Sequence, residues 1–388
     1  TQRGTETTIR YRASMRTRGN SSRSYQFRPL RIGLPDDSAW DGVTSFNLAP
    51  RSPHLQHLGM RLLKASGLAA SNTIPVELRR NGVEYTTSSG STPDYGMWVR
   101  VEPEGREYVQ NHWPNADTGN LYTKRSPDPN GLLDNWSKQN NSASNDWTDL
   151  THFFSIVQST AAPHFPGAPA TDVSQSNGGR LTGTGAWART ALDADGLETL
   201  QTAADTNQWA RFFAAMTILQ DYETNVSNGV DDDYGIYFVP DASGQRRAQF
   251  VPHDLDTILG MGDTPRAYNS VGLFDMTEAG GDSYAFRTLL PLVGTSAFPG
   301  NADFRTAYFT QLRTLLGTVF NADTTASANP SFYQFVDAQL GGWAPPSVIA
   351  PIKEFPRQRR LYLLDLISDG AVGGTTATAI TPPAATAT

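Results

Sequence analysis

The sequence predicts a two-lobed α+β fold, with a strand-rich N-terminal lobe over residues 1–105 and a helix-rich C-terminal lobe over residues 106–367. Two observations carry this prediction. Runs of β-forming residues separated by turn signals dominate the first hundred residues, and apolar residues at helical spacing dominate the chain after residue 200. A Thr/Ala/Pro-rich stretch over residues 368–388 is predicted to be a disordered tail or a linker.

In the N-terminal lobe, β-rich or alternating runs predict strands at residues 9–18, 26–34, 74–80 and 95–101. The pair Asn81-Gly82 is the clearest turn signal. One helix is expected over residues 54–66, because four leucines recur at helical spacing and Gly67 follows as a stop.

In the C-terminal lobe, residues 114–185 are rich in Asn, Ser, Asp, Pro and Gly, which predicts a loop insertion around a short helix at residues 150–157. A strong amphipathic helix is expected over residues 207–220. Two apolar runs, at 235–239 and 248–251, predict a β-hairpin. Further helices are expected at residues 302–316, 331–340 and 349–367.

Composition excludes several partners. The formal net charge of -7 disfavours nucleic acid and anionic membranes, because both require a basic surface. No stretch is long and apolar enough to predict a membrane span. The absence of cysteine excludes disulfides and thiolate metal sites. Few charges, many Thr, Asn and Gly residues, and no signal peptide in residues 1–12 favour a bacterial protein that is secreted or lies on the cell or spore surface, with its leader removed.

The most informative feature is a group of oxygen-bearing side chains in the C-terminal lobe: Asp221, Asn225, Asp233, Asp254 and Asp256. They lie on the loop after a predicted helix, beside the predicted hairpin and on the turn that follows it. Hard divalent cations prefer oxygen ligands. The pattern therefore predicts a metal site, for Mg²⁺ in the first place and otherwise for Ca²⁺ or Mn²⁺.

The order of these residues also indicates a chemistry. Phosphoryl transfer needs one carboxylate that orients or deprotonates the acceptor hydroxyl, and further oxygen ligands that hold the metal against the nucleotide phosphates. Asp221, on the loop after the helix, would be the base. Asp254 and Asp256, after the hairpin, would hold the metal.

A polar turn in the N-terminal lobe supplies the second half of such a site. It contains Arg18, Gly19, Asn20, Ser21 and Ser22 between two predicted strands. A turn of this kind can direct backbone N–H groups and a guanidinium at phosphate oxygens. A polar hairpin turn without a ligand is the alternative interpretation.

These motifs resemble the spore-coat protein H (CotH) kinase family over about residues 9–262. The resemblance is carried by the turn at residues 18–22, by the basic strand from Arg28 to Arg31, by Glu102 and by the run from Val251 to Asp256 with Gly260. It implies an atypical, reduced protein-kinase-like fold. It also implies transfer of the ATP γ-phosphate to Ser or Thr of a protein, with Mg²⁺ as the metal.

The resemblance also assigns roles to single residues. Asp221 would match the catalytic-loop Asp, Asp254 and Asp256 would match the metal-binding turn, and Asn225 or Asp233 would be the second metal ligand. The nucleotide-binding side would comprise Arg18, Gly19, Asn20, Ser21, Ser22, Arg28, Arg31 and Glu102, where Glu102 matches the acidic residue that pairs with a phosphate-binding base.

Three positions depart from the family pattern. The basic strand has Arg28 and Arg31 where lysines are usual, and Arg is not a simple substitute for a compact ammonium. His253 stands where the family has Trp, and a lone His is more often structural than a metal ligand. Asp233 stands before Tyr234 where Asn is usual, and the acidic run at residues 231–233 is either a solvated loop or a calcium ligand.

Two other classes of function remain open. One is a coat, matrix or adhesion protein that binds metal without catalysis, which the missing lysines favour. The other is a metal-dependent hydrolase of an extracellular polymer. For that class Trp113, Trp136 and Trp147 would stack sugars, although core packing is their commoner role. No serine-hydrolase elbow, zinc-protease motif or Walker A motif is present.

Overall fold

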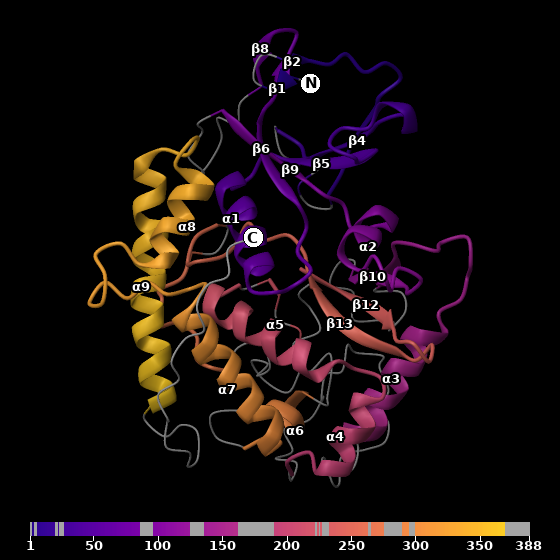
Figure 1. Cartoon of the computed structure of the whole chain (residues 1–388), viewed down its shortest axis with the longest axis vertical. Helices are drawn as coiled ribbons and strands as arrows, with labels where there is room; N and C mark the ends of the chain where they lie inside the picture. Colours follow the sequence, from indigo (N-terminus) through magenta and orange to yellow (C-terminus); the bar gives the residue numbers. More distant parts are fainter. Residues whose placement is uncertain are drawn as a thin grey trace.

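The computed structural model describes residues 2–3, 6–19, 22, 27–85, 96–124, 136–161, 190–221, 223–224, 226, 233–262, 265–274, 289–294 and 299–368. Over these residues the chain has a mixed α+β fold. Antiparallel sheets with helices form the N-terminal part, and helices dominate the C-terminal part (Figure 1). This confirms the predicted α+β class and the order of its two parts.

The main N-terminal sheet is antiparallel and has the strand order β3-β4-β5-β9-β6. Its strands are β3 (Ser14–Thr17), β4 (Leu30–Gly33), β5 (Ser45–Ala49), β6 (Thr73–Glu77) and β9 (Met97–Val101). Buried Phe46, Leu48 and Trp98 form its core. Two short pairs flank it: β1 (Gln2–Arg3) with β2 (Glu6–Thr7), and β7 (Arg79–Arg80) with β8 (Val83–Glu84).

The helix predicted at residues 54–66 is α1 (Pro53–Ala65), and it connects β5 to β6. Pro at the start of a helix is favourable because the first N–H groups have no intrahelical acceptor. The helix ends just before Gly67, whose φ of 78° suits a residue without a side chain. The Asn81-Gly82 turn between β7 and β8 has φ angles of 53° and 81°, the conformation that this pair favours in tight hairpins.

A second antiparallel sheet has the order β11-β10-β12-β13. The predicted hairpin is confirmed as β12 (Tyr234–Pro240) and β13 (Arg246–Pro252). The strands β10 (Leu121–Lys124) and β11 (Trp136–Lys138) lie in the stretch 114–185 that was predicted to be loop around one helix, so this part of the prediction is wrong. Each strand is too short to produce a pattern, and pairing with β12 is what fixes β10.

The C-terminal helices surround α5 (Thr206–Leu219), which packs against α7, α9 and β13. Trp209, Phe212, Phe213 and Met216 are fully buried. Asp205 caps the helix, because its side chain accepts a hydrogen bond from Gln208 N. The others are α2 (Arg106–His112), α3 (Thr148–Ala161), α4 (Ala194–Gln201), α6 (Leu289–Val293), α7 (Ala302–Gly317), α8 (Ser331–Leu340) and α9 (Pro346–Ser368).

The predicted helices at 54–66, 207–220, 302–316, 331–340 and 349–367 are confirmed within one to three residues at each end. The expected helix at 150–157 is the central part of the longer α3. Strand β5 and helices α2 and α4 were not predicted. Among the described helices, none is long and apolar enough to cross a membrane.

One buried arginine connects helix α9 to the end of α5 and to the segment around residue 270. Arg359 of α9 is 0% exposed and donates to the carbonyl oxygens of Thr217 (2.8 Å), Tyr268 (2.8 Å) and Val271 (2.6 Å). A guanidinium can satisfy several carbonyls at once, because its five N–H groups form a rigid fork. Arg359 thereby fixes the end of α5 and the segment around residues 267–271 against α9.

Candidate functional site

The turn after β13 is held by its apolar residues and exposes its acidic ones. Leu255 and Ile258 are fully buried, and they approach Gly59 of α1 so closely that a Cβ atom there would lie 3.0 Å from Leu255 Cβ. Asp254 is exposed and has φ 40°, a left-handed conformation that Asp tolerates better than most residues. Asp256, two residues further along the turn, is half-buried.

The end of α5 places Asp221 next to this turn. Gln220 adopts the left-handed conformation (φ 54°) that ends the helix, and the backbone N–H of Leu259 donates to Leu219 O at 2.7 Å. Asp221 is 1% exposed. Its Oδ1 accepts from Glu223 N at 3.1 Å, whereas its Oδ2 has no hydrogen-bond partner among the described residues.

The carboxylates of this region repel one another. Burial raises the pKa of Asp221 well above its usual range, Glu223 adds to the rise, and hydrogen bonds from Thr224 oppose it. Burial also raises the pKa of Asp256 well above the usual range, and Asp254, Glu223 and Asp221 add to it. Among the described residues, Arg51 is the cation that counters this effect at Asp256. Asp254 and Asp221 therefore both lie close enough to Asp256 for their charges to raise its pKa.

The donor atoms of this region are carboxylate oxygens, which hard cations prefer. The buried Oδ2 of Asp221 has no hydrogen-bond partner among the described residues. Within the described ranges, no three His, Asp or Glu side chains are close enough together to hold one ion. Asn225, predicted as a possible second ligand, lies outside those ranges.

Asp233, the other predicted second ligand, ties the two acidic segments together through its backbone. Its N–H donates to Glu223 O at 3.2 Å, and its carbonyl accepts from Thr224 Oγ1 at 3.1 Å and from His253 N at 3.1 Å. Its side chain is buried. Asp233 is thus adjacent to both the loop of Asp221 and the turn of Asp254.

The predicted phosphate-binding turn is described only in part, because Asn20 and Ser21 lie outside the described residues. Arg18 N donates to Pro29 O at 2.9 Å, and this bond closes the turn between β3 and β4. Gly19 has φ 93°, and a Cβ atom there would overlap the hydroxyl of the half-buried Ser22. The turn therefore requires glycine at this position.

Arg28, before strand β4, and Arg31, within it, differ in exposure. Arg28 is exposed, whereas Arg31 is half-buried and donates to Ser45 Oγ at 3.0 Å and to Asn47 Oδ1 at 3.4 Å. Burial lowers the pKa of Arg31, and the positive charge of Arg18 lowers it further. Two cations kept this close favour an anion between them.

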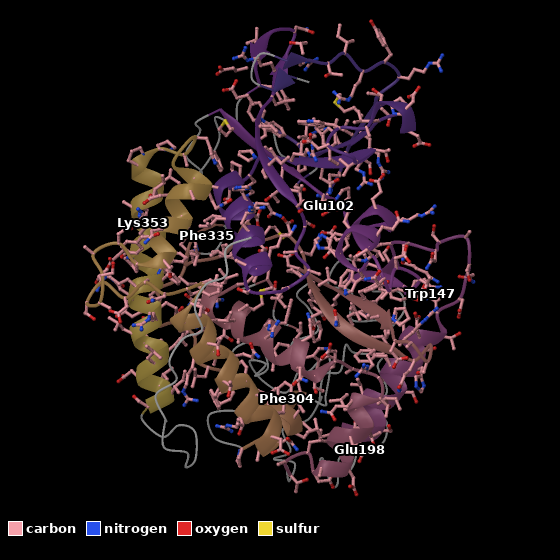
Figure 2. All side chains as sticks on the ribbon, viewed as in Figure 1. Glu102, Trp147, Glu198, Phe304, Phe335 and Lys353 are labelled. Atoms are coloured by element: carbon pink, nitrogen blue, oxygen red, sulfur yellow. The ribbon has the colours of Figure 1, made fainter. Side chains whose placement is uncertain are left out.

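Glu102 does not contact Lys or Arg among its hydrogen-bond partners in the described part of the chain. Its Oε2 accepts from Asn72 N (2.9 Å) and Asn72 Nδ2 (2.8 Å), its Oε1 accepts from Asn111 Nδ2 (2.6 Å), and His112 Nε2 lies 3.1 Å from Oε2. Figure 2 shows Glu102 between the N-terminal sheet and α2. The expected pairing with a phosphate-binding base is replaced by a network that fixes the connection from β9 to α2.

A buried ion pair that sequence reasoning missed joins this connection to the acidic turn. Glu104 Oε1 lies 3.0 Å from His253 Nδ1. Burial would lower the pKa of His253, but the Glu104 carboxylate outweighs it and raises that pKa to about 9. The charge of Arg18 lowers the pKa of both Glu104 and His253, so Arg18, in the predicted phosphate-binding turn, lies near the acidic turn. His253 is therefore structural, and no local pattern marks Glu104 as its partner.

The three tryptophans considered as sugar platforms pack against other aromatic rings. Trp136 is 5% exposed and lies edge-on to Tyr234. Trp147 packs against Tyr122, with ring centroids 5.2 Å apart, and Trp113 packs against Tyr237 at 4.2 Å. Trp113 and Trp147 are only partly buried.

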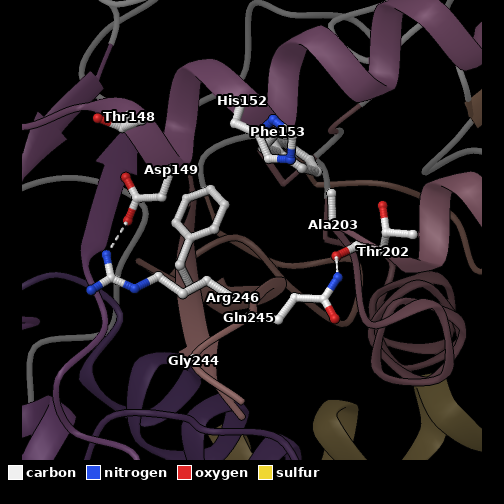
Figure 3. A pocket seen from close by; sticks show the side chains of 10 residues that line it. Thr148, Asp149, His152, Phe153, Thr202, Ala203, Gly244, Gln245 and Arg246 are labelled. Atoms are coloured by element: carbon white, nitrogen blue, oxygen red, sulfur yellow. Dashed lines mark hydrogen bonds and ion pairs between the residues drawn. The ribbon is translucent and has the colours of Figure 1, made fainter.

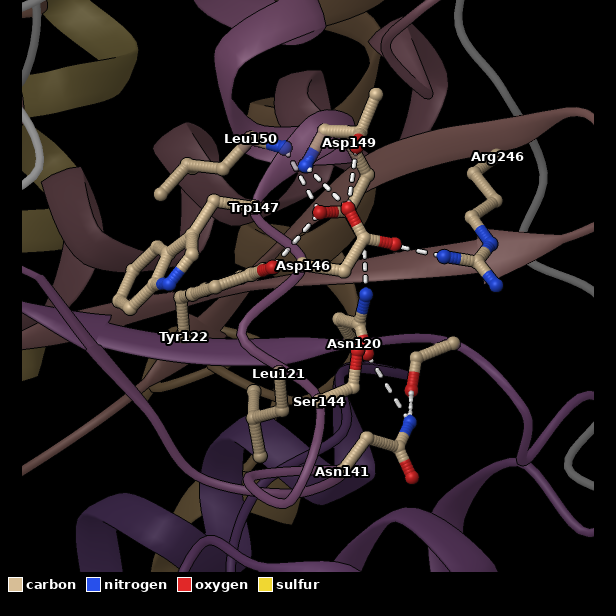
Figure 4. A network of polar contacts seen from close by, with 12 residues as sticks. Asn120, Leu121, Tyr122, Asn141, Ser144, Asp146, Trp147, Asp149, Leu150 and Arg246 are labelled. Atoms are coloured by element: carbon tan, nitrogen blue, oxygen red, sulfur yellow. Dashed lines mark hydrogen bonds and ion pairs between the residues drawn. The ribbon is translucent and has the colours of Figure 1, made fainter.

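A separate pocket of about 350 Å³ lies between α3, the turn of the β12–β13 hairpin and the residues after α4 (Figure 3). His152 and Gln245 lie at it, and Arg246 reaches Asp149 at 3.3 Å. Asp149 also accepts from Asn120 Nδ2 and from Tyr122 Oη, each at 2.7 Å (Figure 4). With these donors Asp149 is well satisfied, and its network fixes α3 to β10 and β13.

Comparison of the chain with protein-family models and with curated proteins finds no match. The functional assignment therefore depends on the chemistry and geometry of these residues.

Proposed function

We propose that the chain is an atypical CotH-like protein kinase that transfers the γ-phosphate of ATP to Ser or Thr of a secreted or coat protein. The observation that supports this most strongly is that Asp221, after helix α5, and Asp254, after the β12–β13 hairpin, both lie close enough to Asp256 for their charges to raise its pKa. A helix, a catalytic carboxylate, a hairpin and a metal-binding turn follow in this order in protein kinases. The sheet-rich N-terminal part above this site is in keeping with a two-lobed kinase-like fold.

In this proposal each residue has a distinct role. Asp221 would accept the proton of the acceptor hydroxyl on Oδ2, the oxygen without a hydrogen-bond partner among the described residues. A nearby Mg²⁺ would keep this carboxylate ionised, because its charge would oppose the burial and the repulsion that raise the Asp221 pKa. Asp254 and Asp256 would hold Mg²⁺, with Asn225 or Asp233 completing the ligand set. Bound Mg²⁺ would neutralise charge that develops on the phosphate oxygens. Mn²⁺ or Ca²⁺ would use the same oxygen ligands.

The nucleotide phosphates would lie against the cationic side of the site. Arg31 of β4 lies near Arg18, which directly follows β3, and the charge of Arg18 adds to the lowering of the Arg31 pKa by burial, so an anion between the two guanidinium groups would relieve their repulsion. Arg28 is exposed on the same strand connection. Backbone N–H groups of the turn containing Gly19, Asn20, Ser21 and Ser22 would add donors.

A second candidate is a metal-binding coat, matrix or adhesion protein of the same fold without catalysis. Two observations favour it: the Arg31 guanidinium already binds Ser45 and Asn47, and Glu102 is held by amides and His112 instead of a phosphate-binding base. No specific contact among the described residues favours the polymer hydrolase, because Trp136 is buried and Trp113 and Trp147 pack against aromatic rings.

Transfer of labelled γ-phosphate to the chain itself or to a Ser-rich protein tests the first candidate. The parent with Mg²⁺ should give labelled product, and Asp221→Asn and Asp254→Asn should each lower the rate by about 10²–10⁴. Asp195→Asn, a change of an exposed carboxylate on α4, should leave the rate unchanged.

Thermal unfolding separates the two candidates. Stabilisation by Mg²⁺ that ATP increases further supports the kinase, whereas stabilisation by Mg²⁺ or Ca²⁺ without an effect of ATP and without labelled product supports the non-catalytic protein. If neither metal nor ATP changes the melting temperature, both candidates are wrong.

A further inference from the structure

A second cavity, of about 500 Å³, lies at the opposite end of α5 from Asp221. The turn after α1, the end of α2, the first turns of α5 and strand β13 surround it. Because α5 has 14 residues and an α-helix rises about 1.5 Å per residue, the two ends of this helix are about 20 Å apart. The cavity is therefore separate from the proposed phosphotransfer site, and its volume is in the range of small-molecule sites.

One wall of the cavity is a fixed chain of polar groups. Trp113 Nε1 donates to Gln249 Oε1 at 3.2 Å, Gln249 Nε2 donates to Asp205 Oδ2 at 2.9 Å, and Asp205 Oδ1 accepts from Gln208 N at 3.1 Å. The single indole N–H of Trp113 is used, whereas Gln249 and Asp205 use only part of their hydrogen-bonding capacity on these neighbours. The second N–H of Gln249 and further lone pairs of Asp205 remain for a ligand. The wall is thus oriented before any ligand binds.

Two further lining residues, Arg211 and Asn207 of α5, offer donors that the described residues do not use. Arg211 Nε donates to Gln311 Oε1 at 3.3 Å, which orients the guanidinium, and its terminal N–H groups have no acceptor among the described residues. Gly67 makes room for it, since a Cβ atom there would lie 2.9 Å from Arg211 Nη1. Asn207 is exposed, and its amide makes no hydrogen bond with the described residues.

The balance of these groups indicates the class of ligand. The lining includes one carboxylate, Asp205, one guanidinium, Arg211, and the ring of His112, whose Nε2 lies 3.1 Å from Glu102 Oε2. The remaining polar groups are mainly amides, so the cavity has no excess of positive charge for a phosphate or a polyanion. Hydroxyl groups both donate and accept, and they match amides and a carboxylate equally well. Because the Trp113 ring packs against Tyr237, recognition would depend on these polar groups and not on stacking against that ring. We propose that this cavity binds a neutral saccharide, at the scale of one or two sugar units.

The test uses the full chain and titrates glucose, N-acetylglucosamine and cellobiose against tryptophan fluorescence and ligand-observed NMR. Saturable binding to at least one of them is expected, with a dissociation constant on the order of 1 mM for a single sugar unit. Asn207→Ala and Arg211→Gln should each weaken binding by about tenfold, the effect of one lost hydrogen bond to a charged or well-placed partner. His152→Ala, at the other pocket, should leave the affinity unchanged.

Three results would each overturn the proposal. These are the absence of saturable binding for all three sugars, equal weakening by His152→Ala, and tighter binding of glucose 6-phosphate than of glucose. Asn207→Ala tests the site without risk to the fold, because its amide makes no hydrogen bond that the variant would remove from the described structure. The outcome is independent of phosphate transfer, since none of the proposed transfer residues lines this cavity.

Discussion

The ion pair between Glu104 and His253 should be a major contributor to stability, and the replacement Glu104→Gln removes its negative charge. The two side chains are 7% and 22% exposed, and their atoms are 3.0 Å apart. The pair connects the segment after β9 to the residue before Asp254. Loss of one partner leaves the other charge buried without compensation, which is the costly way to break a buried pair.

The pKa of His253 gives the magnitude. Although burial opposes it, the pKa rises from 6.5 to about 9, and at 1.36 kcal/mol per pKa unit this corresponds to about 3 kcal/mol. The pKa of Glu104 falls from 4.5 to about 2, against the effect of burial. The two changes report the same interaction and are counted once. Glu104→Gln should therefore lower the free energy of unfolding by about 3 kcal/mol near pH 6.

The sign of the pH dependence follows from the two pKa shifts, upward for His253 and downward for Glu104. The contribution of His253 is complete below pH 6.5, the unfolded value, and is lost as the pH rises through about 9. The contribution of Glu104 is complete above pH 4.5 and is lost as the pH falls through about 2. The pair thus stabilises the protein most between pH 4.5 and 6.5. The parent should lose stability as the pH rises from 6.5 to 9, and Glu104→Gln should lose much less over this range.

Urea unfolding followed by tryptophan fluorescence, with a chelator present, measures these effects at about pH 6 and about pH 10. The set of variants is Glu104→Gln, His253→Gln, the double variant and Glu198→Gln, which changes an exposed carboxylate of α4. A coupling free energy of about 2–3 kcal/mol is expected from the cycle. Coupling below about 0.5 kcal/mol, or an unchanged pH dependence in His253→Gln, would refute the reasoning.

Three further predictions concern the fold around the site. Arg359→Lys should lower the free energy of unfolding by about 2–4 kcal/mol in urea, because one ammonium cannot reach all the carbonyls that the guanidinium binds; a loss below about 1 kcal/mol would contradict this. Gly262→Ala should cost about 1–3 kcal/mol and weaken stabilisation by Mg²⁺, because φ is 99° and a Cβ atom would overlap Asp256 O; Gly244→Ala, with φ 85° but open space, should cost less, and equal losses would contradict the steric argument. Asp149→Ala should cost about 1–3 kcal/mol in thermal unfolding by leaving Tyr122 Oη without its acceptor, and an unchanged melting temperature would show that the network of Figure 4 is not stabilising.

Elements with strong local signals were predictable. Helix α5 has an apolar stripe and an Asp cap, and the β12–β13 hairpin has two apolar runs around a Pro- and Gly-containing turn. Strands β10 and β11 were missed because their three or four residues carry no period, and their pairing with β12 supplies the hydrogen bonds that hold them.

The candidate site was predictable in part. Asp221, Asp254 and Asp256 were identified as carboxylates on loops beside regular elements, and in the structure the charges of Asp254 and Asp221 add to the rise in the pKa of Asp256. Their role as base and metal ligands stays a prediction. Glu102 was expected to pair with a base, but Asn72, Asn111 and His112 surround it. Side-chain partners depend on which segments pack together, and a single sequence does not specify this.

The α+β class, the main helices, the hairpin and the chemical nature of the acidic side chains follow from the sequence, because they depend on periodicity, turn residues and functional groups within short windows. Three features follow only from the packing of distant segments: Glu104 lies beside His253, the charge of Arg51 acts on Asp256, and Arg211 lines a polar cavity. These partners lie far apart in the chain. Only the burial of apolar residues such as Leu255 and Ile258 against α1 fixes the distances between them, and with them the charges and pKa values of the site.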